Sequence, residues 1–275
     1  MKIRKIIDKH THEIEFLKIA QLEKKLINNI SNSDILIFDR NIAEIGLIKK
    51  LLKRFPKRSI VIKGHEKIKN IHNYSSIIEK IIKLGVQRKT IIYSFGGGTL
   101  GDLSGFLAST ILRGVEHVMI PTSLLAMVDS SIGGKTGINS KFGKNLIGTF
   151  YLPKKVFICT EFLKSLPKRE IACGYAEIIK YSLIHSKRLH KLLVKGAKGD
   201  MNKIIKLSIN SKLKYISDFR EKLKSKNSRA ILNFGHTIGH AIENSNFYRT
   251  VNKCEPFLSK HNLKTLYKAI NSSFL

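Results

Sequence analysis

Short apolar runs alternate with stretches of helical spacing over the first 160 residues of the chain. The first two runs favour a hairpin. Strands that alternate with helices are typical of a parallel sheet covered by helices, so the pattern predicts an α/β fold for this part. The predicted helices lie near residues 42–54, 75–84 and 101–112. The predicted strands lie at residues 2–7, 12–17, 34–38, 59–62, 90–93, 117–120 and 156–159.

The pattern changes close to residue 160, where the strand signals end. Helical spacing then covers residues 168–186, 202–224 and 229–244. We therefore expect a boundary within residues 160–167 and two domains. They are an α/β domain at residues 1–160 and an all-α domain at residues 161–275.

The chain carries 50 Lys and Arg residues against 20 Asp and Glu residues, which gives a net charge of +30. Such an excess is common in nucleic-acid-binding proteins. Here the lysines are spread over the whole chain and no block concentrates them. We therefore interpret the charge as a compositional bias and expect no nucleic-acid partner. The positive potential would still attract anionic, phosphorylated substrates.

Simple counts exclude further classes of protein. Hydrophobic residues make up 43% of the chain, which suffices for a packed core and is too high for a disordered chain. No run of roughly 18 apolar residues occurs, so we expect no membrane span, and the charged N-terminus is unlike a signal peptide. Cys159, Cys173 and Cys254 lie far apart, which argues against a zinc ribbon or a disulfide framework. We expect reduced thiols and a cytoplasmic location.

Residues 96–101 satisfy the pattern G-x-G-x-x-G between a predicted strand and a predicted helix. Such glycines let backbone N–H groups approach a pyrophosphate, although an ordinary strand-to-helix turn is the alternative. The usual acidic partner ends the next strand, roughly 20 residues on. No residue fills that place, because Glu116 precedes its strand. Asp39 at the end of an earlier strand, with Asn41 beside it, is the candidate for holding a ribose.

A second glycine-rich segment, residues 129–136, ends in G-K-T. The P-loop pattern requires Gly where Asp129 stands, so we reject ATP or GTP hydrolysis. Lys135 and the Gly143, Lys144 and Asn145 triplet still lie in a predicted glycine-punctuated loop between strands. Lysines and free backbone donors in such a loop suit a phosphate or a carboxylate, and a solvated loop is the alternative.

Two histidines in the predicted helical domain have a spacing that suits a metal. His236 and His240 stand four residues apart and share a helix face, with Asn233 one turn earlier. Glu177 and Lys180 form a pair with a spacing of three on another helix. A carboxylate with imidazoles can hold a divalent ion and leave a position open for substrate oxygens. Purely structural histidines are the alternative.

Eight motifs follow one another along the chain, at residues 96–102, 112–114, 120–122, 128–136, 143–145, 166–170, 176–181 and 232–243. Taken together and in this order, they resemble the motifs of 3-dehydroquinate synthase. The resemblance runs from about residue 39 to residue 244. It implies a Rossmann-like NAD-binding α/β domain and an all-α domain that holds a divalent metal, zinc or cobalt, in a cytoplasmic homodimer. The reaction it implies converts 3-deoxy-arabino-heptulosonate 7-phosphate, a sugar phosphate, to 3-dehydroquinate and phosphate in the shikimate route to aromatic amino acids.

The resemblance also implies roles for single residues. Metal ligands would be Glu177 and His236. Cofactor binding would fall to Asp39, Asn41, Glu66, Lys69, Gly97, Gly98, Gly101, Asp102, Thr122 and Lys144. Substrate binding and catalysis would fall to Asp129, Lys135, Asn145, Lys180, Lys214, Arg229, Asn233 and His240, and to Arg113 of the partner subunit.

The sequence departs from the family pattern near its C-terminus. A third metal ligand, a His in H-G-E-A, is expected where residues 251–256 have V-N-K-C-E-P. Lys253 stands near that position, and Lys is a poor zinc ligand because its amine must first lose a proton. Cys254 and His261 are the alternative ligands. The chain ends at Leu275, so we expect an incomplete helical domain. An active synthase, another sugar-phosphate cyclase and a non-catalytic relative that retains NAD binding all stay open.

Overall fold

The computed structural model describes residues 1–7, 9–194, 200–216 and 229–234 of the chain. The chain divides into two compact units, Met1–Leu166 and Pro167–Leu275. The 3₁₀ helix η6 (Thr160–Ser165), whose Phe162 is buried, therefore belongs to the first unit.

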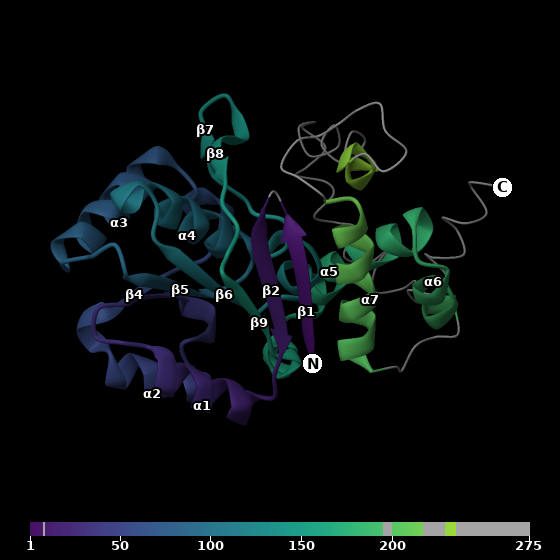
Figure 1. Ribbon diagram of the computed structural model, residues 1–275, viewed down its shortest axis with the longest axis horizontal. Helices are drawn as coiled ribbons and strands as arrows, with labels where there is room; N and C mark the ends of the chain where they lie inside the picture. The colour runs from purple at the N-terminus through teal and green to yellow at the C-terminus, as the bar shows by residue number, and fades with distance from the viewer. Residues whose placement is uncertain (8, 195–199, 217–228, 235–275) are drawn as a thin grey trace. The chain divides into compact units, whose positions relative to one another are not determined.

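A seven-stranded sheet forms the centre of the first unit (Figure 1). Its strands follow the order β1-β2-β9-β6-β5-β3-β4. β1 and β2 form an antiparallel hairpin, and the other pairs are parallel. The predicted parallel sheet and hairpin are thus confirmed. The strands are β1 (Lys2–Ile7), β2 (His10–Phe16), β3 (Ile35–Asp39), β4 (Ser59–Ile62), β5 (Ile91–Gly96), β6 (Glu116–Pro121) and β9 (Lys155–Ile158).

Helices cover both faces of this sheet (Figure 1). The helices α1 (Ile19–Asn29) and α2 (Gly46–Arg54) lie on one face. The helices α3 (Ile71–Lys83) and α4 (Gly98–Thr110) lie on the other, over a core of apolar residues from β3, β4 and β5. The sequence pattern missed α1. It also placed the start of α3 near residue 75, whereas the helix begins at Ile71. The side chain of Asn70 caps it there by accepting from the backbone N–H of Asn73 at 2.9 Å.

The predicted loop over residues 129–145 is wrong for its second half, which forms a β-hairpin. β7 (Lys135–Ser140) and β8 (Gly143–Phe150) pair in a separate antiparallel sheet. Gly137 and Gly148 face each other in the register. A Cβ on Gly148 would lie 2.1 Å from the carbonyl oxygen of Thr136. The glycines that indicated a loop therefore permit close approach of two strands.

The described part of the second unit is helical, as predicted. It contains α5 (Lys168–Ile184), α6 (Lys187–Val194), α7 (Met201–Lys214) and the 3₁₀ helix η7 (Arg229–Asn233). The helices α5, α6 and α7 pack against one another. Among the described residues, no helix has the length and apolar character needed to cross a membrane.

Candidate functional site

The carboxyl ends of β3 and β5 form the edge at which a nucleotide would bind in a sheet of this kind. β5 ends at Gly96, Gly97 caps α4, and Gly98 opens it. A Cβ on Gly98 would lie 2.8 Å from the hydroxyl of Ser130, so only glycine allows this close packing. Gly97 and Gly98 carry no side chains at the start of α4, where the first N–H groups of a helix lack intrahelical partners and can bind a phosphate. Gly101 and Asp102 follow in the first turns of the same helix.

Asp39 lies at the same edge as the glycine motif. Its carboxylate Oδ1 accepts from the backbone N–H of Asn41 at 3.0 Å and of Gly64 at 3.3 Å. A Cβ on Gly96 would lie 3.3 Å from the Cβ of Asp39, which shows how near the two segments are. The structure thus brings the candidate ribose ligand next to the predicted phosphate loop. Thr122 is also here, because its N–H donates to the carbonyl of Gly96 at 2.9 Å.

Lys69 is the centre of a polar cluster at this edge. Its side chain is only 3% exposed. The ammonium donates to Asp102 Oδ2 at 2.7 Å and to Asn145 Oδ1 at 2.6 Å, and lies 4.0 Å from Glu66 Oε1. Four residues that the sequence assigned to cofactor or substrate therefore meet, although three separate segments supply them.

Asp102 has a shifted proton affinity within this cluster. Burial raises the pKa of its carboxyl from 3.8 to about 6, and the ammonium of Lys69 opposes this rise. The negative charges of Glu66 and Asp129 add to the rise, which also places Asp129 close to this cluster. A carboxyl with a pKa near 6 can hold or release a proton close to neutral pH.

Three residues of this edge were missed in the sequence. Asn139 donates through Nδ2 to Glu66 Oε1 at 2.7 Å. Thr99 donates to the other oxygen of Glu66 at 3.3 Å. The hydroxyl of Ser130 is buried and has no hydrogen-bond partner among the described residues. The position of Thr99 inside the glycine motif was the available signal for it. Asn139 gave none, because its segment was expected to be a loop.

The other basic candidates of this unit are exposed. Lys135 opens β7 and lines a narrow cavity with Asp102, Ser130 and Thr136. Lys144 lies on β8. Arg113 has a φ of +66°, a left-handed conformation that costs a non-glycine residue roughly 1–2 kcal/mol. Backbone strain of this kind is often found at functional sites.

In the second unit, Glu177 and Lys180 form an ion pair on α5. The ammonium of Lys180 also donates to the carbonyl of Leu232 at 2.9 Å, and this carbonyl is next to Asn233. Arg229, in the same short helix as Leu232, is only 3% exposed. The structure thus brings Glu177, Lys180 and the Arg229–Asn233 segment into one neighbourhood.

Lys214 lies near an unpredicted residue, His185, with 3.4 Å between its ammonium and Nδ1. Burial lowers the pKa of His185, and the charge of Lys214 lowers it further. His236 and His240 lie outside the described residues, as do Lys253, Cys254 and His261. Within the described ranges, no three His, Cys, Asp or Glu side chains are placed to hold a metal ion.

Two family models match the chain. The model described as 3-dehydroquinate synthase N-terminal matches residues 59–173, and the one described as 3-dehydroquinate synthase C-terminal matches residues 174–255. The 3-dehydroquinate synthase of Prochlorococcus marinus (strain AS9601) is 44% identical over 239 residues, which cover 84% of this chain and 64% of that protein. The 3-dehydroquinate synthase of Pelagibacter ubique (strain HTCC1062) is 46% identical over 223 residues, or 77% of this chain and 59% of that protein. The chain therefore spans about three fifths of the length of these relatives.

Solved structures of sugar-phosphate cyclases also match the fold of this chain. A 2-deoxy-scyllo-inosose synthase complexed with carbaglucose-6-phosphate, NAD+ and Co2+ matches with a TM-score of 0.73 and 25% identity, over 88% of this chain and 69% of that one. The 2-epi-5-epi-valiolone synthase of Streptomyces hygroscopicus subsp. jinggangensis 5008, with NAD+ and Zn2+ bound, matches with a TM-score of 0.70 and 23% identity, over 84% and 68% of the two chains. At that identity the second match supports the fold alone.

Proposed function

The chain belongs to the 3-dehydroquinate synthase family, and on this basis we propose that it converts 3-deoxy-arabino-heptulosonate 7-phosphate to 3-dehydroquinate and phosphate. The observation that carries the proposal is the cluster around Lys69. There, Glu66, Asp102 and Asn145 converge within reach of one buried ammonium. A chance likeness in sequence would not bring residues assigned to the cofactor and to the substrate together at one sheet edge.

The edge fits NAD as the cofactor. Its glycine motif leaves the N-terminus of α4 open for a pyrophosphate, and the buried hydroxyl of Ser130 stands beside Gly98. Bound NAD would supply a hydride acceptor that is regenerated in each turnover. Asp39 and Asn41 would hold the adenosine side. Glu66, Lys69, Gly97, Gly101, Asp102, Thr122 and Lys144 would complete the cofactor site.

The helical unit supplies residue types that suit a divalent metal and an anionic substrate. Glu177 would be a ligand with His236, and bound zinc or cobalt would polarise a substrate hydroxyl. Lys180, paired with Glu177, and the buried Arg229 would bind hydroxyl and carboxylate groups of the substrate. Asn145, Asn233, His240 and Arg113 of the partner subunit would surround the phosphate, and Asp129, Lys135 and Lys214 would contact the substrate.

We expect purified protein to release phosphate from the heptulosonate phosphate in the presence of NAD, and to do so faster when zinc is added. The measurement is a coupled phosphate assay with and without zinc. No release in either condition would contradict the proposed activity. The alternative is a non-catalytic relative that retains the NAD fold, and it is favoured by Lys253, which stands where the family pattern has a metal ligand. NAD binding without stoichiometric metal would support that alternative.

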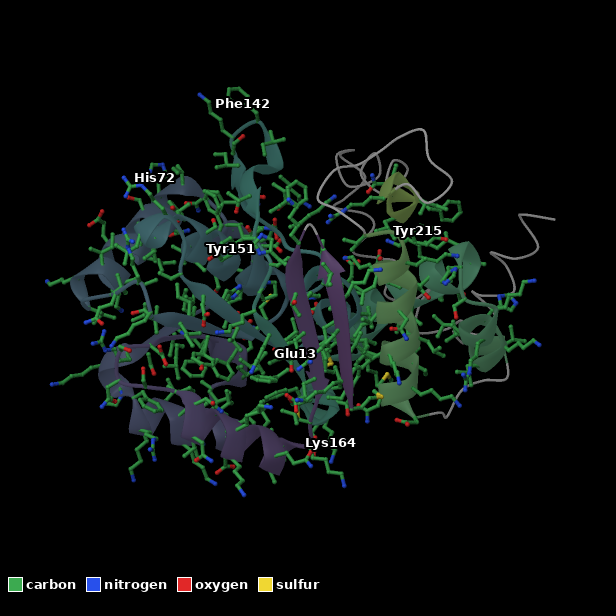
Figure 2. All side chains as sticks on the ribbon, viewed as in Figure 1. Glu13, His72, Phe142, Tyr151, Lys164 and Tyr215 are labelled. Atoms are coloured by element: carbon green, nitrogen blue, oxygen red, sulfur yellow. The ribbon has the colours of Figure 1, made fainter. Side chains whose placement is uncertain are left out.

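We also propose that two copies of the chain associate. Phe142, Leu146 and Phe150 on the β7–β8 hairpin are 82%, 64% and 44% exposed, and Leu112 beside Arg113 is 45% exposed. Figure 2 shows Phe142 at the projecting end of the hairpin. Exposed apolar side chains on a projecting element are typical of protein interfaces. A homodimer would bury them and could bring Arg113 of one copy to the other copy's phosphate site.

The double substitution Phe142→Ser and Leu146→Ser should convert the dimer to a monomer, because it removes apolar area from the interface. Size-exclusion chromatography with light scattering measures this as a halved mass. Ile6→Ser is the matched control, since Ile6 is an apolar residue that is 68% exposed and lies on β1, outside the hairpin. A wild-type protein that is monomeric at every concentration would rule the homodimer out.

A further inference from the structure

The ammonium of Lys69 links the glycine-motif helix to the β7–β8 hairpin. We propose that Lys69 is a positioning residue that orients the side-chain amide of Asn145, so that the amide nitrogen donates to the substrate phosphate, and that Asp102 anchors Lys69 for this purpose. The inference rests on the proposed function, which assigns the phosphate to Asn145. It gives Lys69 a role beyond contact with the cofactor.

The direction of each hydrogen bond in the cluster is fixed by chemistry. An ammonium can only donate, so Asn145 must present its oxygen to Lys69, at 2.6 Å. The backbone N–H of Asn145 donates to Asn139 Oδ1 at 2.8 Å. Asn139 must then turn its Nδ2 to the carboxylate of Glu66, at 2.7 Å. Because the side-chain oxygen of Asn145 accepts from Lys69, the side-chain nitrogen Nδ2 of Asn145 faces away from Lys69.

This orientation matters because a phosphate accepts hydrogen bonds and cannot donate them when fully ionised. An Asn145 with its amide reversed would present an oxygen to the phosphate and repel it. Without Lys69, the two orientations of the amide would differ little in free energy. The lysine thus selects the orientation that binds substrate.

Two further features hold the segment in place. Asn145 has a φ of +57°, which Asn tolerates better than most residues. The backbone N–H of Asn139 donates to the carbonyl of Lys69 at 2.7 Å, so main chain and side chain of Lys69 both hold the hairpin. The Lys69 side chain is 3% exposed, and its ammonium is anchored by Asp102, whose Oδ2 accepts from it at 2.7 Å. Loss of either partner would loosen the hairpin base.

The first experiment needs no catalysis. Lys69→Met keeps the apolar stem and removes the donor, and hydrogen exchange of the ligand-free protein is followed by mass spectrometry. We expect peptides that cover residues 139–146 to exchange roughly tenfold faster or more. Lys67→Met is the matched control, because Lys67 is an exposed lysine of the neighbouring 3₁₀ helix, η3 (Glu66–Ile68). Unchanged exchange in Lys69→Met would overturn the proposal even if the enzyme is inactive.

The second experiment is a double-mutant cycle on the KM for the heptulosonate phosphate. Asn145→Gly keeps the left-handed backbone and removes the amide. We expect Lys69→Met and Asn145→Gly each to raise KM roughly tenfold to a hundredfold, and the double variant to be no worse than Asn145→Gly alone. If the increases in KM of the two single variants multiply in the double variant, Lys69 acts independently of Asn145, and the inference is overturned.

The NAD affinity of each variant, measured by direct titration, separates this role from cofactor binding. The Asn145→Gly protein should bind NAD as the wild type does. A circular-dichroism spectrum checks that Lys69→Met folds, and Lys69→Arg serves as the second variant if it does not. The guanidinium of Lys69→Arg would retain a donor, so exchange at residues 139–146 should stay within about threefold of the wild type. An absence of turnover in the wild type would contradict the proposed function and leave the exchange result to decide the inference.

Discussion

Replacing Glu177 with alanine is expected to abolish retention of a divalent metal and to leave NAD binding intact. Glu177 carries the negative charge next to Lys180 on α5. Without it, the ammonium of Lys180, which is only 8% exposed, would repel a cation from this neighbourhood. Changes to groups that merely support a ligand reduce metal affinity by about 10- to 100-fold, so loss of a ligand should exceed a hundredfold.

Metal content is measured by elemental analysis after dialysis against zinc, and NAD affinity by titration of the same samples. Glu170→Ala is the matched control, because Glu170 lies on the same helix and is exposed. If Glu177→Ala retains zinc as well as Glu170→Ala does, Glu177 is not a ligand. Loss of NAD affinity in Glu177→Ala would instead show a defect in folding.

Acidification is expected to destabilise the first unit through His117. This side chain is 1% exposed on β6, and its Nε2 lies 2.9 Å from the hydroxyl of Ser94. Burial lowers the pKa of His117 from 6.5 to about 3. Below pH 6.5 the unfolded chain therefore binds a proton that the folded chain rejects, and the free energy of unfolding falls until about pH 3. Between pH 7 and pH 4, His117 lowers the free energy of unfolding by about 3 kcal/mol.

Asp102 has the opposite effect over part of this range. Because its pKa is raised, the folded chain binds a proton between about pH 6 and pH 3.8 that the unfolded chain does not bind. The free energy of unfolding therefore rises by about 2 kcal/mol between pH 7 and pH 4. The contribution of His117 is the larger of the two. From pH 7 to pH 4, the two groups together should therefore lower the free energy of unfolding of the wild type by about 1 kcal/mol.

The variant His117→Gln separates the contribution of His117 from that of Asp102, because a Gln side chain can still form a hydrogen bond with Ser94 and does not titrate. Its free energy of unfolding, relative to that of the wild type, should rise by about 3 kcal/mol from pH 7 to pH 4. Urea titrations followed by circular dichroism at pH 7, 5.5 and 4 measure this difference. His72→Gln, at an exposed histidine, is the control. Parallel pH curves for the wild type and His117→Gln would contradict the assigned cause.

Local pattern was enough to predict most elements of the sheet. β3, β5 and β9 are short, buried and apolar, and the polar segments between them show helical spacing. The pattern failed for α1 and for the β7–β8 hairpin. α1 buries only Leu22 and Leu26, so its apolar signal is sparse. The hairpin has exposed apolar residues and paired glycines, which in most sequences indicate a loop.

The resemblance assigned roles to Lys69, Asp102 and Asn145, and these assignments stay predictions. Nothing in their spacing along the sequence indicated that the three side chains touch. Lys69 is 33 residues from Asp102 and 76 from Asn145. The contacts of Asn139 and Thr99 were equally hidden, since each donates a hydrogen bond to Glu66 in a distant segment.

By itself, the sequence determined the α/β unit, the helical unit and the glycine motif, because each depends on neighbouring residues and on backbone geometry that repeats locally. Only the tertiary structure decided which side chains share the buried ammonium of Lys69, because parallel strands gather distant segments at one edge. Burial there raises the pKa of Asp102, and a one-way series of hydrogen bonds orients Asn145. Both effects arise from packing, which no local pattern encodes.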